Sequence, residues 1–201
     1  RPAAGPADTL LLPLLSTKLH RPPVTGEIVC RKRLHEVMDR ALELPLTLVS
    51  APAGYGKSTL VSDWAETLDK PCAWVSLDPG DSDLKVFVSY VLAAIETVVP
   101  DACPETLALA MSNNPVPVPV LGASLVNELD ALDSPLVLVL DDYHRIGPAS
   151  SVHEFLWFLL EHPPPALRLV LATRSDPTFS TGSLRGRGGL TEVRLRDLRF
   201  T

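Results

Sequence analysis

Residues 46–59 read LTLVSAPAGYGKST, and this stretch decides the fold. Leu46–Ser50 is a short apolar run that predicts a buried strand, and the small residues at 51–56 are typical of a turn. After the turn, apolar residues recur at helical spacing, at Leu60, Val61, Trp64 and Leu68. A strand, a glycine-bearing loop, the triplet Gly-Lys-Ser and a helix, in this order, are the context of a phosphate-binding P-loop.

The residue types of this loop suit a chain of phosphates. Small residues let several backbone N–H groups approach the phosphates together, and Gly54 and Gly56 can adopt positive φ. The helix that begins near Lys57 directs its unpaired N–H groups and the positive end of its dipole at the ligand. We therefore expect a nucleotide, ATP or ADP, to bind along Ala53, Gly54, Tyr55, Gly56, Lys57, Ser58 and Thr59.

Two residues of the loop have distinct predicted roles. Lys57 is expected to reach the β- and γ-phosphates, and the hydroxyl of Ser58 is expected to hold Mg²⁺. The usual motif begins with glycine, whereas this one begins with Ala51. Alanine is small enough for the position, but it must adopt an ordinary backbone conformation. The alternative is a glycine-rich turn with an incidental lysine, and the flanking strand and helix favour the P-loop.

A second motif follows at residues 135–143, PLVLVLDDY. Its apolar residues 136–140 predict a strand buried on both faces, and Asp141 and Asp142 follow directly. Ligands of open α/β sheets bind at the carboxyl ends of the strands, so paired acids at such an end indicate a site. Asp141 is expected to belong to the Mg²⁺ shell, and Asp142 to orient or activate the attacking water. The alternative is an acidic turn that begins a loop.

The remaining pattern predicts the fold. Further apolar runs predict strands at residues 72–77, 167–172 and 191–195. Amphipathic patterns predict helices at residues 31–42, 84–99, 104–111, 121–132 and 150–161. Together they indicate an α/β fold, a doubly wound, mostly parallel five-stranded sheet with helices on both faces. Residues 31–201 are expected to form this P-loop nucleotide-binding domain, and residues 1–30 an extended N-terminal arm that lies on it.

Two of the predicted connections between helices and strands have an unusual amino-acid composition. Residues 78–83, DPGDSD, are expected to form a solvated turn that caps the next helix, in preference to a metal-binding loop, which requires more ligands at fixed spacing. Residues 113–119, NNPVPVP, are expected to be a surface connection, because proline suits neither a helix interior nor a central strand.

Arginine and histidine residues follow the later strands. Arg174 comes after the strand at 167–172 and is placed to reach a γ-phosphate, with an exposed loop arginine as the alternative. Residues 180–189 are predicted to be a loop, in which Arg185 and Arg187 keep the segment solvated in preference to reaching the nucleotide. His144 is expected to pack or to form a hydrogen bond within its loop.

Composition excludes several classes of protein. The formal net charge of −6 argues against nucleic-acid binding by this segment alone. The three cysteines, Cys30, Cys72 and Cys103, lack metal-ligand spacing and suit a reducing compartment. No apolar run is as long as a membrane span, and no convincing signal peptide is present, so we expect a cytoplasmic protein without a membrane partner. We expect the chain to be a fragment of a longer regulator.

Four segments resemble one family. They are APAGYGKSTL, LVLVLDDYH, LVLATRSDP and LTEVRLRDLRFT, in this order. The chain resembles the N-terminal nucleotide-binding domain of the large ATP-dependent LuxR-type transcription activators, the maltose-regulon activator group of the STAND class of signalling NTPases. Its segments STKLHRPP and IVCRKRL resemble the arm and the adenine-side segment of that family. The resemblance covers residues 15–201.

The resemblance implies a function and further site residues. Members of the family bind ATP or ADP as a switch, in which ADP accompanies a resting monomer and ATP with an inducer favours self-association and activation of transcription. By motif match, Asp141 has the Walker B role and Arg174 the sensor role, and Val29 and Arg31 match the segment near adenine. DNA binding belongs to a C-terminal domain that is absent from this chain.

The second acid affects the expected rate of hydrolysis. Asp142 is one methylene shorter than a glutamate, so a water-activating role requires a different reach. We expect slow Mg²⁺-dependent ATP hydrolysis, with Asp142, Lys57 and Arg174 as the catalytic residues. Slow hydrolysis suits a switch better than a motor.

Two other functions remain open. The first is a P-loop phosphotransferase acting on a small molecule, which requires a second substrate pocket and an arginine-rich lid, for which residues 185–187 are the sole candidate. The second is a catalytically degenerate interaction module that binds nucleotide without turnover, or not at all, an interpretation that Ala51 and Asp142 leave open. A turnover assay without an acceptor separates a switch from a phosphotransferase.

Overall fold

Five parallel strands form one sheet in the order β2-β3-β4-β1-β5. The computed structural model describes residues 13–24 and 32–199. The strands are β1 (Leu46–Ser50), β2 (Cys72–Ser76), β3 (Leu136–Asp141), β4 (Leu167–Thr173) and β5 (Leu190–Arg194). The predicted five-stranded, mostly parallel sheet is therefore confirmed. The strand predicted at 191–195 begins and ends one residue earlier.

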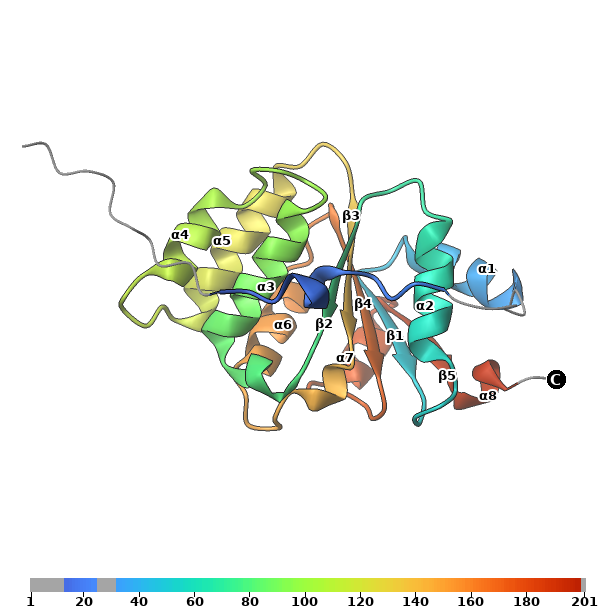
Figure 1. Ribbon diagram of the computed structural model, residues 1–201. Coiled ribbons are helices and arrows are strands. Elements are labelled where there is room, and N and C mark those ends of the chain that lie inside the picture. The colour runs from blue at the N-terminus through green and yellow to red at the C-terminus, as the bar shows by residue number, and fades with distance from the viewer. Residues whose placement is uncertain (1–12, 25–31, 200–201) are drawn as a thin grey trace, which may run out of the picture.

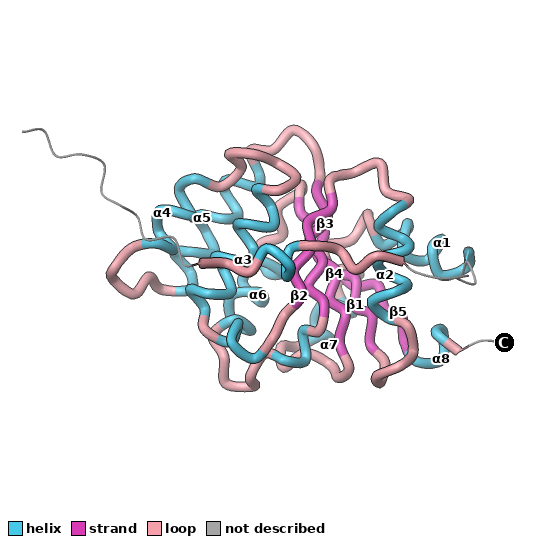
Figure 2. The backbone as a smooth tube through the Cα atoms, in the orientation of Figure 1, coloured by secondary structure: helices cyan, strands magenta, loops and turns pink. Residues whose placement is uncertain are grey.

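Helices connect the strands on both faces of the sheet (Figure 1). The α-helices are α1 (Lys32–Ala41), α2 (Lys57–Glu66), α3 (Leu84–Glu96), α4 (Pro104–Met111), α5 (Val118–Asp130), α6 (Val152–Glu161), α7 (Thr181–Gly186) and α8 (Leu195–Leu198). The described residues also contain the short 3₁₀ helices η1 (Ser16–Leu19), η2 (Pro79–Ser82) and η3 (Tyr143–Arg145). Figure 2 shows how these connections alternate with the strands.

Two predicted loops contain helix. The structure places α7 inside residues 180–189, so the prediction of a loop there is wrong; the side chain of Leu184 is 2% exposed and anchors the turn in the core. The predicted surface connection at 113–119 also ends early, because α5 begins at Val118. A proline in the first turn of a helix is tolerated, since the N–H group it lacks has no partner inside the helix.

The two faces of the sheet bury separate clusters, because successive side chains of a strand point to opposite sides. In β3, the leucines at 136, 138 and 140 pack in the cluster that contains α3, α5 and α6. The valines at 137 and 139 pack in the cluster of α1 and α2 on the other face. All six residues of β3 are buried, as the run of apolar residues predicts for a central strand.

This topology brings the predicted motifs to one edge. β4 lies between β3 and β1, and the carboxyl ends of all three strands point the same way. The ladder continues past the strands, because the N–H of Ala51 donates to the carbonyl of Thr173 at 3.2 Å and that of Leu77 to the carbonyl of Asp141 at 2.9 Å. The P-loop, the acid pair and Arg174 therefore follow neighbouring strands.

The described part of the predicted arm, residues 13–24, crosses the edge strand β2 between α3 and α2 (Figure 1). It contains η1 and is therefore not fully extended. Lys18 is 8% exposed, and its Nζ lies 3.1 Å from Asp78 and 2.5 Å from Asp81. Farther along, Arg21 donates to the carbonyl of Ser62 in α2 at 2.8 Å. The segment thus joins the first helix after the P-loop to the β2–α3 connection.

Residues 78–83 form the predicted cap. Asp78 and Asp81 form a capping box around η2, and Asp83 accepts a hydrogen bond from the N–H of Val86 at 3.0 Å in the first turn of α3. No cluster of three or more histidine, cysteine, aspartate or glutamate residues that could hold a metal occurs among residues 13–24 and 32–199. Over the same ranges, no helix has the length and apolar character required to cross a membrane.

We predict that Lys18→Met destabilises the fold. The change leaves the carboxylate of Asp81, which is 1% exposed, without this ammonium partner. Removing one partner of a buried ion pair costs about 3 kcal/mol in the free energy of unfolding, measured by urea denaturation. Lys85→Met, at an exposed position of α3, is the matched control and should change stability by less than about 0.5 kcal/mol. Equal stability of the two variants would contradict the assignment.

The other ion pair of Lys18, with Asp78, has a predicted pH dependence. The hydrogen bond from Lys18 holds the pKa of Asp78 below its ordinary value. A carboxyl group with a lowered pKa in the folded state stabilises the protein above its unfolded pKa, and the contribution is lost as pH falls through the folded pKa. The stability difference between the unmodified protein and Lys18→Met should therefore narrow below about pH 4, measured by urea denaturation across pH.

Candidate nucleotide-binding site

The loop between β1 and α2 has the backbone conformation that a P-loop requires. Gly54 has φ of 84° and Gly56 has φ of 73°, in the left-handed region that favours glycine. Gly56 is the N-cap residue of α2, so the helix begins at Lys57 as predicted. Ala51 is not among the described residues with positive φ, and its side chain is buried in the core. Alanine at the first position therefore fits the loop without strain.

Lys57 is buried beside the loop and carries a poorly compensated charge. Its side chain is 7% exposed, and its Nζ donates to the carbonyl of Pro52 at 3.1 Å. Burial lowers the pKa of Lys57, and the nearby charge of Arg174 lowers it further, against the opposing effect of Asp141. An anion bound here would restore the stability of the ammonium form. This environment suits a phosphate group.

Ser58 and Asp141 meet as the sequence predicts for a Mg²⁺ site. The hydroxyl of Ser58 donates to Oδ1 of Asp141 at 2.9 Å, and the N–H of Asp142 donates to the same oxygen at 2.9 Å. Asp141 is 6% exposed, and burial raises its pKa. It has no ion pair within the described part of the chain.

The oxygen atoms present fit magnesium. Mg²⁺ is usually held by one or two protein oxygens together with waters and substrate phosphates, and a buried carboxylate beside a hydroxyl supplies that minimum. An ion bound only by the protein would need more ligands than these. The fit therefore requires a phosphate ligand at the same place.

A cleft of about 230 Å³ joins these elements. It is lined by Ala53, Gly54, Gly56, Lys57, Ser58, Thr59, Asp142 and Arg174. Arg174 is exposed and has no hydrogen bond or ion pair among residues 13–24 and 32–199. Tyr55 does not line this cleft, and its side chain is 38% exposed. Val29 and Arg31, predicted to lie near adenine, are outside the described residues.

The two arginines of the candidate lid of a phosphotransferase, Arg185 and Arg187, have partners outside the 230 Å³ cleft. Arg185 pairs with Glu192 at 3.0 Å, and Arg187 lies over the ring of Trp157, with 5.9 Å from its guanidinium carbon to the ring centroid. Neither residue lines the 230 Å³ cleft. The structure thus brings Lys57, Ser58, the acid pair and Arg174 together, and it leaves Arg185 and Arg187 outside.

A second hollow adjoins the P-loop, and sequence reasoning missed it. Its volume is about 630 Å³, and Arg174 lines both this hollow and the 230 Å³ cleft. It is lined partly by arginines that the sequence analysis did not single out, Arg194 of β5, Arg196 of α8 and Arg199 directly after α8. The sequence feature that could have indicated it is the group of three arginines in VRLRDLR, residues 193–199. Arg194 is held by Asp176 and Glu192.

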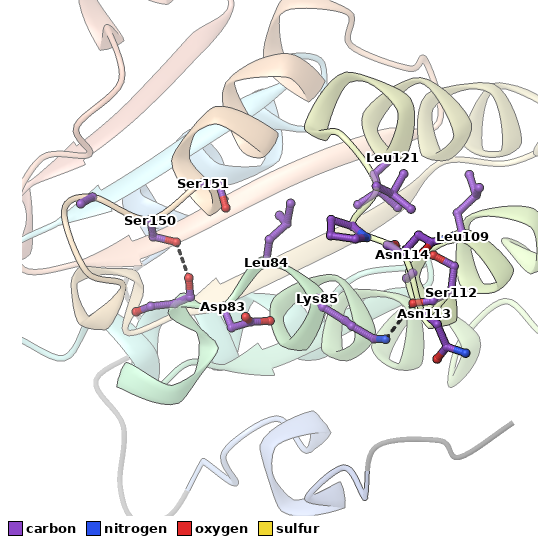
Figure 3. Close-up of a pocket in the computed structure, with 15 residues that line it drawn as sticks. Asp83, Leu84, Lys85, Leu109, Ser112, Asn113, Asn114, Leu121, Ser150 and Ser151 are labelled. Atoms are coloured by element: carbon purple, nitrogen blue, oxygen red, sulfur yellow. Dashed lines mark hydrogen bonds between the residues drawn. The ribbon is translucent and has the colours of Figure 1, made fainter.

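A third cavity, of about 480 Å³, lies among the helices α3, α4, α5 and α6 (Figure 3). It is bounded by the N-terminal ends of α3 and α6 and by the α4–α5 connection. Lys85 donates to the carbonyl of Ser112 at 3.1 Å, and Ser150 donates to the carbonyl of Ser82 at 2.6 Å. Leu84 and Leu121 supply apolar surface. No residue lines both this cavity and the 230 Å³ cleft.

A family model described as AAA ATPase domain matches residues 27–171. The chain belongs to the AAA ATPase domain family. The matched range contains both the P-loop and the acid pair. This AAA ATPase domain is therefore an ATP-binding P-loop NTPase domain in fold and in family.

Solved structures agree with the fold. The domain is similar to Cdc6p from Pyrobaculum aerophilum, with a TM-score of 0.56 and 16% identity over 90% of this chain and 49% of that one. It is also similar to a Walker-type ATPase of Pyrococcus abyssi, with a TM-score of 0.55 and 17% identity over 87% of this chain and 56% of that one. At these identities the likeness concerns the fold alone.

Curated relatives are transcription regulators. The HTH-type transcriptional regulator MalT of Yersinia pestis (strain Pestoides F) is 36% identical over 93% of this chain and 20% of its own length. MalT of Cronobacter sakazakii (strain ATCC BAA-894) is 38% identical over 94% of this chain and 21% of its own length. The resemblance to the large transcription activators is thus confirmed. The domain spans about a fifth of the length of the curated relatives it matches.

We predict that Asp141→Asn raises the Tm of the nucleotide-free domain. The raised pKa means that the ionised carboxylate opposes folding at neutral pH, above its ordinary value of about 3.9. Asparagine keeps an oxygen for the hydrogen bonds from Ser58 and from the N–H of residue 142, without the charge. We expect the free energy of unfolding to increase by about 1 kcal/mol, which corresponds to a rise in Tm of ~2–4 °C, measured by calorimetry at pH 7.

The control for this prediction is Asp133→Asn, at an exposed position, which should leave Tm unchanged. The difference between Asp141→Asn and the unmodified domain should shrink below about pH 4, where the carboxyl group is protonated in both states. A lower Tm for Asp141→Asn at pH 7 would show that the charge of this residue stabilises the ligand-free fold.

Proposed function

We propose that this AAA ATPase domain is the nucleotide switch of a transcription regulator. It binds ATP or ADP with Mg²⁺ and hydrolyses ATP slowly, and the bound nucleotide controls self-association and DNA-dependent activation by the longer protein. The observation that carries the proposal is the hydrogen bond from Ser58 to Asp141 beside the buried Lys57, at the cleft where the P-loop meets the acid pair.

Each residue of the site has a separate proposed role. Backbone N–H groups of the P-loop and the start of α2 bind the phosphates, and Lys57 adds its charge. Ser58 and Asp141 hold Mg²⁺, which supplies positive charge to the phosphate oxygens when it is bound. Asp142 lies in the cleft and orients the attacking water. Arg174, exposed and without an ion pair in the described residues, reaches the γ-phosphate.

Two observations support a regulator over an independent enzyme. The relatives that are 36% and 38% identical are named as transcription regulators, and this domain corresponds to about a fifth of their length. With a formal net charge of −6, the domain as a whole has no net electrostatic attraction to DNA. We infer that DNA is bound by another part of the longer protein and that the domain acts on it through its nucleotide state.

The 480 Å³ cavity bears on the phosphotransferase alternative. A phosphotransferase must place its acceptor against the γ-phosphate, whereas this cavity shares no lining residue with the nucleotide cleft. The arginines of the candidate lid, Arg185 and Arg187, also contact Glu192 and Trp157, which do not line the cleft. Both facts favour the switch, whereas the 630 Å³ hollow shares Arg174 with the cleft, is lined by Arg185 and offers a place for an acceptor. The turnover assay therefore decides between the two functions. Turnover that stays slow with and without small-molecule acceptors is the result the switch requires.

We predict that Lys57→Ala weakens nucleotide binding about 10- to 100-fold. A charge-assisted contact contributes roughly 1.5–3 kcal/mol, which corresponds to this change in Kd. Titration calorimetry with ADP and with ATP–Mg²⁺ measures it, and Lys85→Ala, outside the cleft, is the control and should bind normally. Absence of binding by the unmodified chain would favour the interaction module.

We predict that Arg174→Ala weakens binding of ATP more than binding of ADP. The guanidinium is proposed to contact the γ-phosphate, which ADP lacks, so the Kd for ATP–Mg²⁺ should rise about tenfold and that for ADP less than about twofold. Arg196→Ala removes an arginine whose side chain is 88% exposed and serves as the control. Equal weakening for both nucleotides would place Arg174 away from the γ-phosphate.

A further inference from the structure

An apolar hollow of about 430 Å³ lies between α3 and α4, which pack against each other (Figure 1). Among the described residues, none lines both this hollow and the 230 Å³ cleft. Its apolar surface comes from α3, from α4 and from the segment before η1, chiefly through Leu14, Leu92, Ile95, Leu107 and Met111. Cavities of about 300–1,000 Å³ with mainly apolar walls are typical of small-molecule sites.

The hollow leaves apolar surface open to solvent. The side chain of Leu107 is 38% exposed, and that of Leu15, next to the lining residue Leu14, is 61% exposed. On the α3 side, Leu92 and Ile95 are buried, so this wall is continuous with the core. An apolar group that entered the hollow would remove both its own surface and this exposed surface from water, which favours binding.

Two carboxylates line the same hollow. Glu96 is the last residue of α3, and Asp101 lies in the turn that leads to α4. Oε2 of Glu96 accepts a hydrogen bond from the N–H of Asp101 at 3.0 Å, which ties the turn to the end of α3. Within residues 13–24 and 32–199, neither carboxylate has an ion pair, and no lysine, arginine or histidine lines the hollow.

The thiol of Cys103 indicates the sign of the charge around the hollow. Cys103 is buried and lines the hollow. Burial raises the pKa of the Cys103 thiol to about 12, and the negative charges of Glu128 and Glu96 contribute to the rise. The thiol is therefore uncharged at neutral pH and adds to the apolar wall. The same carboxylates that oppose a thiolate here would stabilise a cation.

We propose that the 430 Å³ hollow binds a small organic ammonium ion with an apolar body. The apolar body contacts Leu92, Leu107 and Met111, and the ammonium group lies at the carboxylates of Glu96 and Asp101. A neutral apolar molecule would leave these carboxylates without an opposite charge, and an apolar anion would be repelled by them. The proposal does not depend on the nucleotide switch, because the two sites share no described lining residue.

The two methionines of the chain, Met38 and Met111, provide a reporter and its reference. Met111 lines the hollow, whereas Met38 is fully buried in the cluster on the other face of the sheet. With ¹³C-labelled methionine methyl groups, a phenyl ring that enters the hollow shifts the NMR signal of Met111 and leaves that of Met38 in place. The probes are phenylbutylamine, phenylbutanol and phenylbutyrate, which share one apolar body and differ in charge.

Titration of the Met111 signal gives a Kd for each probe. We expect phenylbutylamine to bind about threefold to tenfold more tightly than phenylbutanol and more than about tenfold more tightly than phenylbutyrate, because partly exposed charge pairs contribute modestly to affinity. The preference for the amine should shrink at high salt, which screens exposed charges. Equal Kd values for the three probes would overturn the ammonium class, and an unchanged Met111 signal with all three would overturn the site.

A double variant tests the two carboxylates. Glu96→Gln with Asp101→Asn removes both charges and keeps a side-chain oxygen at residue 96 for the hydrogen bond from the N–H of residue 101. Asparagine also tolerates the φ of 57° at that position. We expect this variant to bind the amine and the alcohol with Kd values within about twofold of each other.

The matched control is Glu161→Gln with Asp133→Asn, which removes two exposed carboxylates that do not line the hollow. It should keep the preference for the amine. A preference that survives in the Glu96 and Asp101 variant, or that is lost equally in the control, would overturn the role of these carboxylates.

A second variant tests the position of the ligand. Ala93→Leu adds volume to the α3 wall of the hollow and should abolish the Met111 shift with every probe, while an unchanged Met38 signal shows that the fold is retained. A Met111 shift that persists in this variant would overturn the site.

Two other occupants would also overturn the proposal. The leucines at 10–12 precede the lining residue Leu14 in the chain and lie outside the described residues. Probe binding that appears only after these leucines are replaced by serine would show that the chain's own segment fills the hollow. A Met111 signal that changes with protein concentration in the absence of probe would show that a second copy does.

Discussion

The hydrogen bond from Ser58 to Asp141 is the constraint on which the site depends. It joins residues 83 positions apart in the chain, from the first turn of α2 to the end of β3. Between them lies β4, which separates β3 from β1 in the sheet. Only a parallel arrangement brings the carboxyl ends of these strands to one edge. The register of β3, β4 and β1 therefore sets the spacing between the residues proposed to bind the phosphates and the metal ion.

That hydrogen bond fixes a carboxylate where burial disfavours its charge. Burial raises the pKa of Asp141 and lowers that of Lys57, so both groups are less stable as ions than they are in water. A divalent cation and a phosphate would supply the missing opposite charges at these two places. Because a ligand that binds only the folded state stabilises it, the proposed nucleotide would raise the free energy of unfolding of the domain.

The sheet and the P-loop were predictable because their signals are local. An apolar run defines β3, and the positive φ of Gly54 and Gly56 follows from the motif. The missed features depend on contacts between distant residues. Lys18 pairs with Asp81, 63 positions away, and α7 forms in a segment without helical periodicity because Leu184 is buried in the core. The arginines of the second hollow come together only when β5 pairs with β1.

Asp141, the last residue of β3, and Asp142, which follows it, differ in a way that affects the expected rate of ATP hydrolysis. Oδ1 of Asp141 accepts two hydrogen bonds at 2.9 Å, and its side chain is buried, so the position proposed for the metal ion is formed before any ligand arrives. The carboxylate of Asp142 is partly exposed, with its nearest side-chain donors, His144 and Arg145, at 3.8 and 3.7 Å. The residues proposed to bind the metal ion are thus preorganised. The contacts of Asp142, which is proposed to orient the water, must still shorten before the chemical step. Since reorganisation adds to the barrier of the chemical step, this asymmetry favours firm binding with slow hydrolysis, which is the behaviour a switch requires.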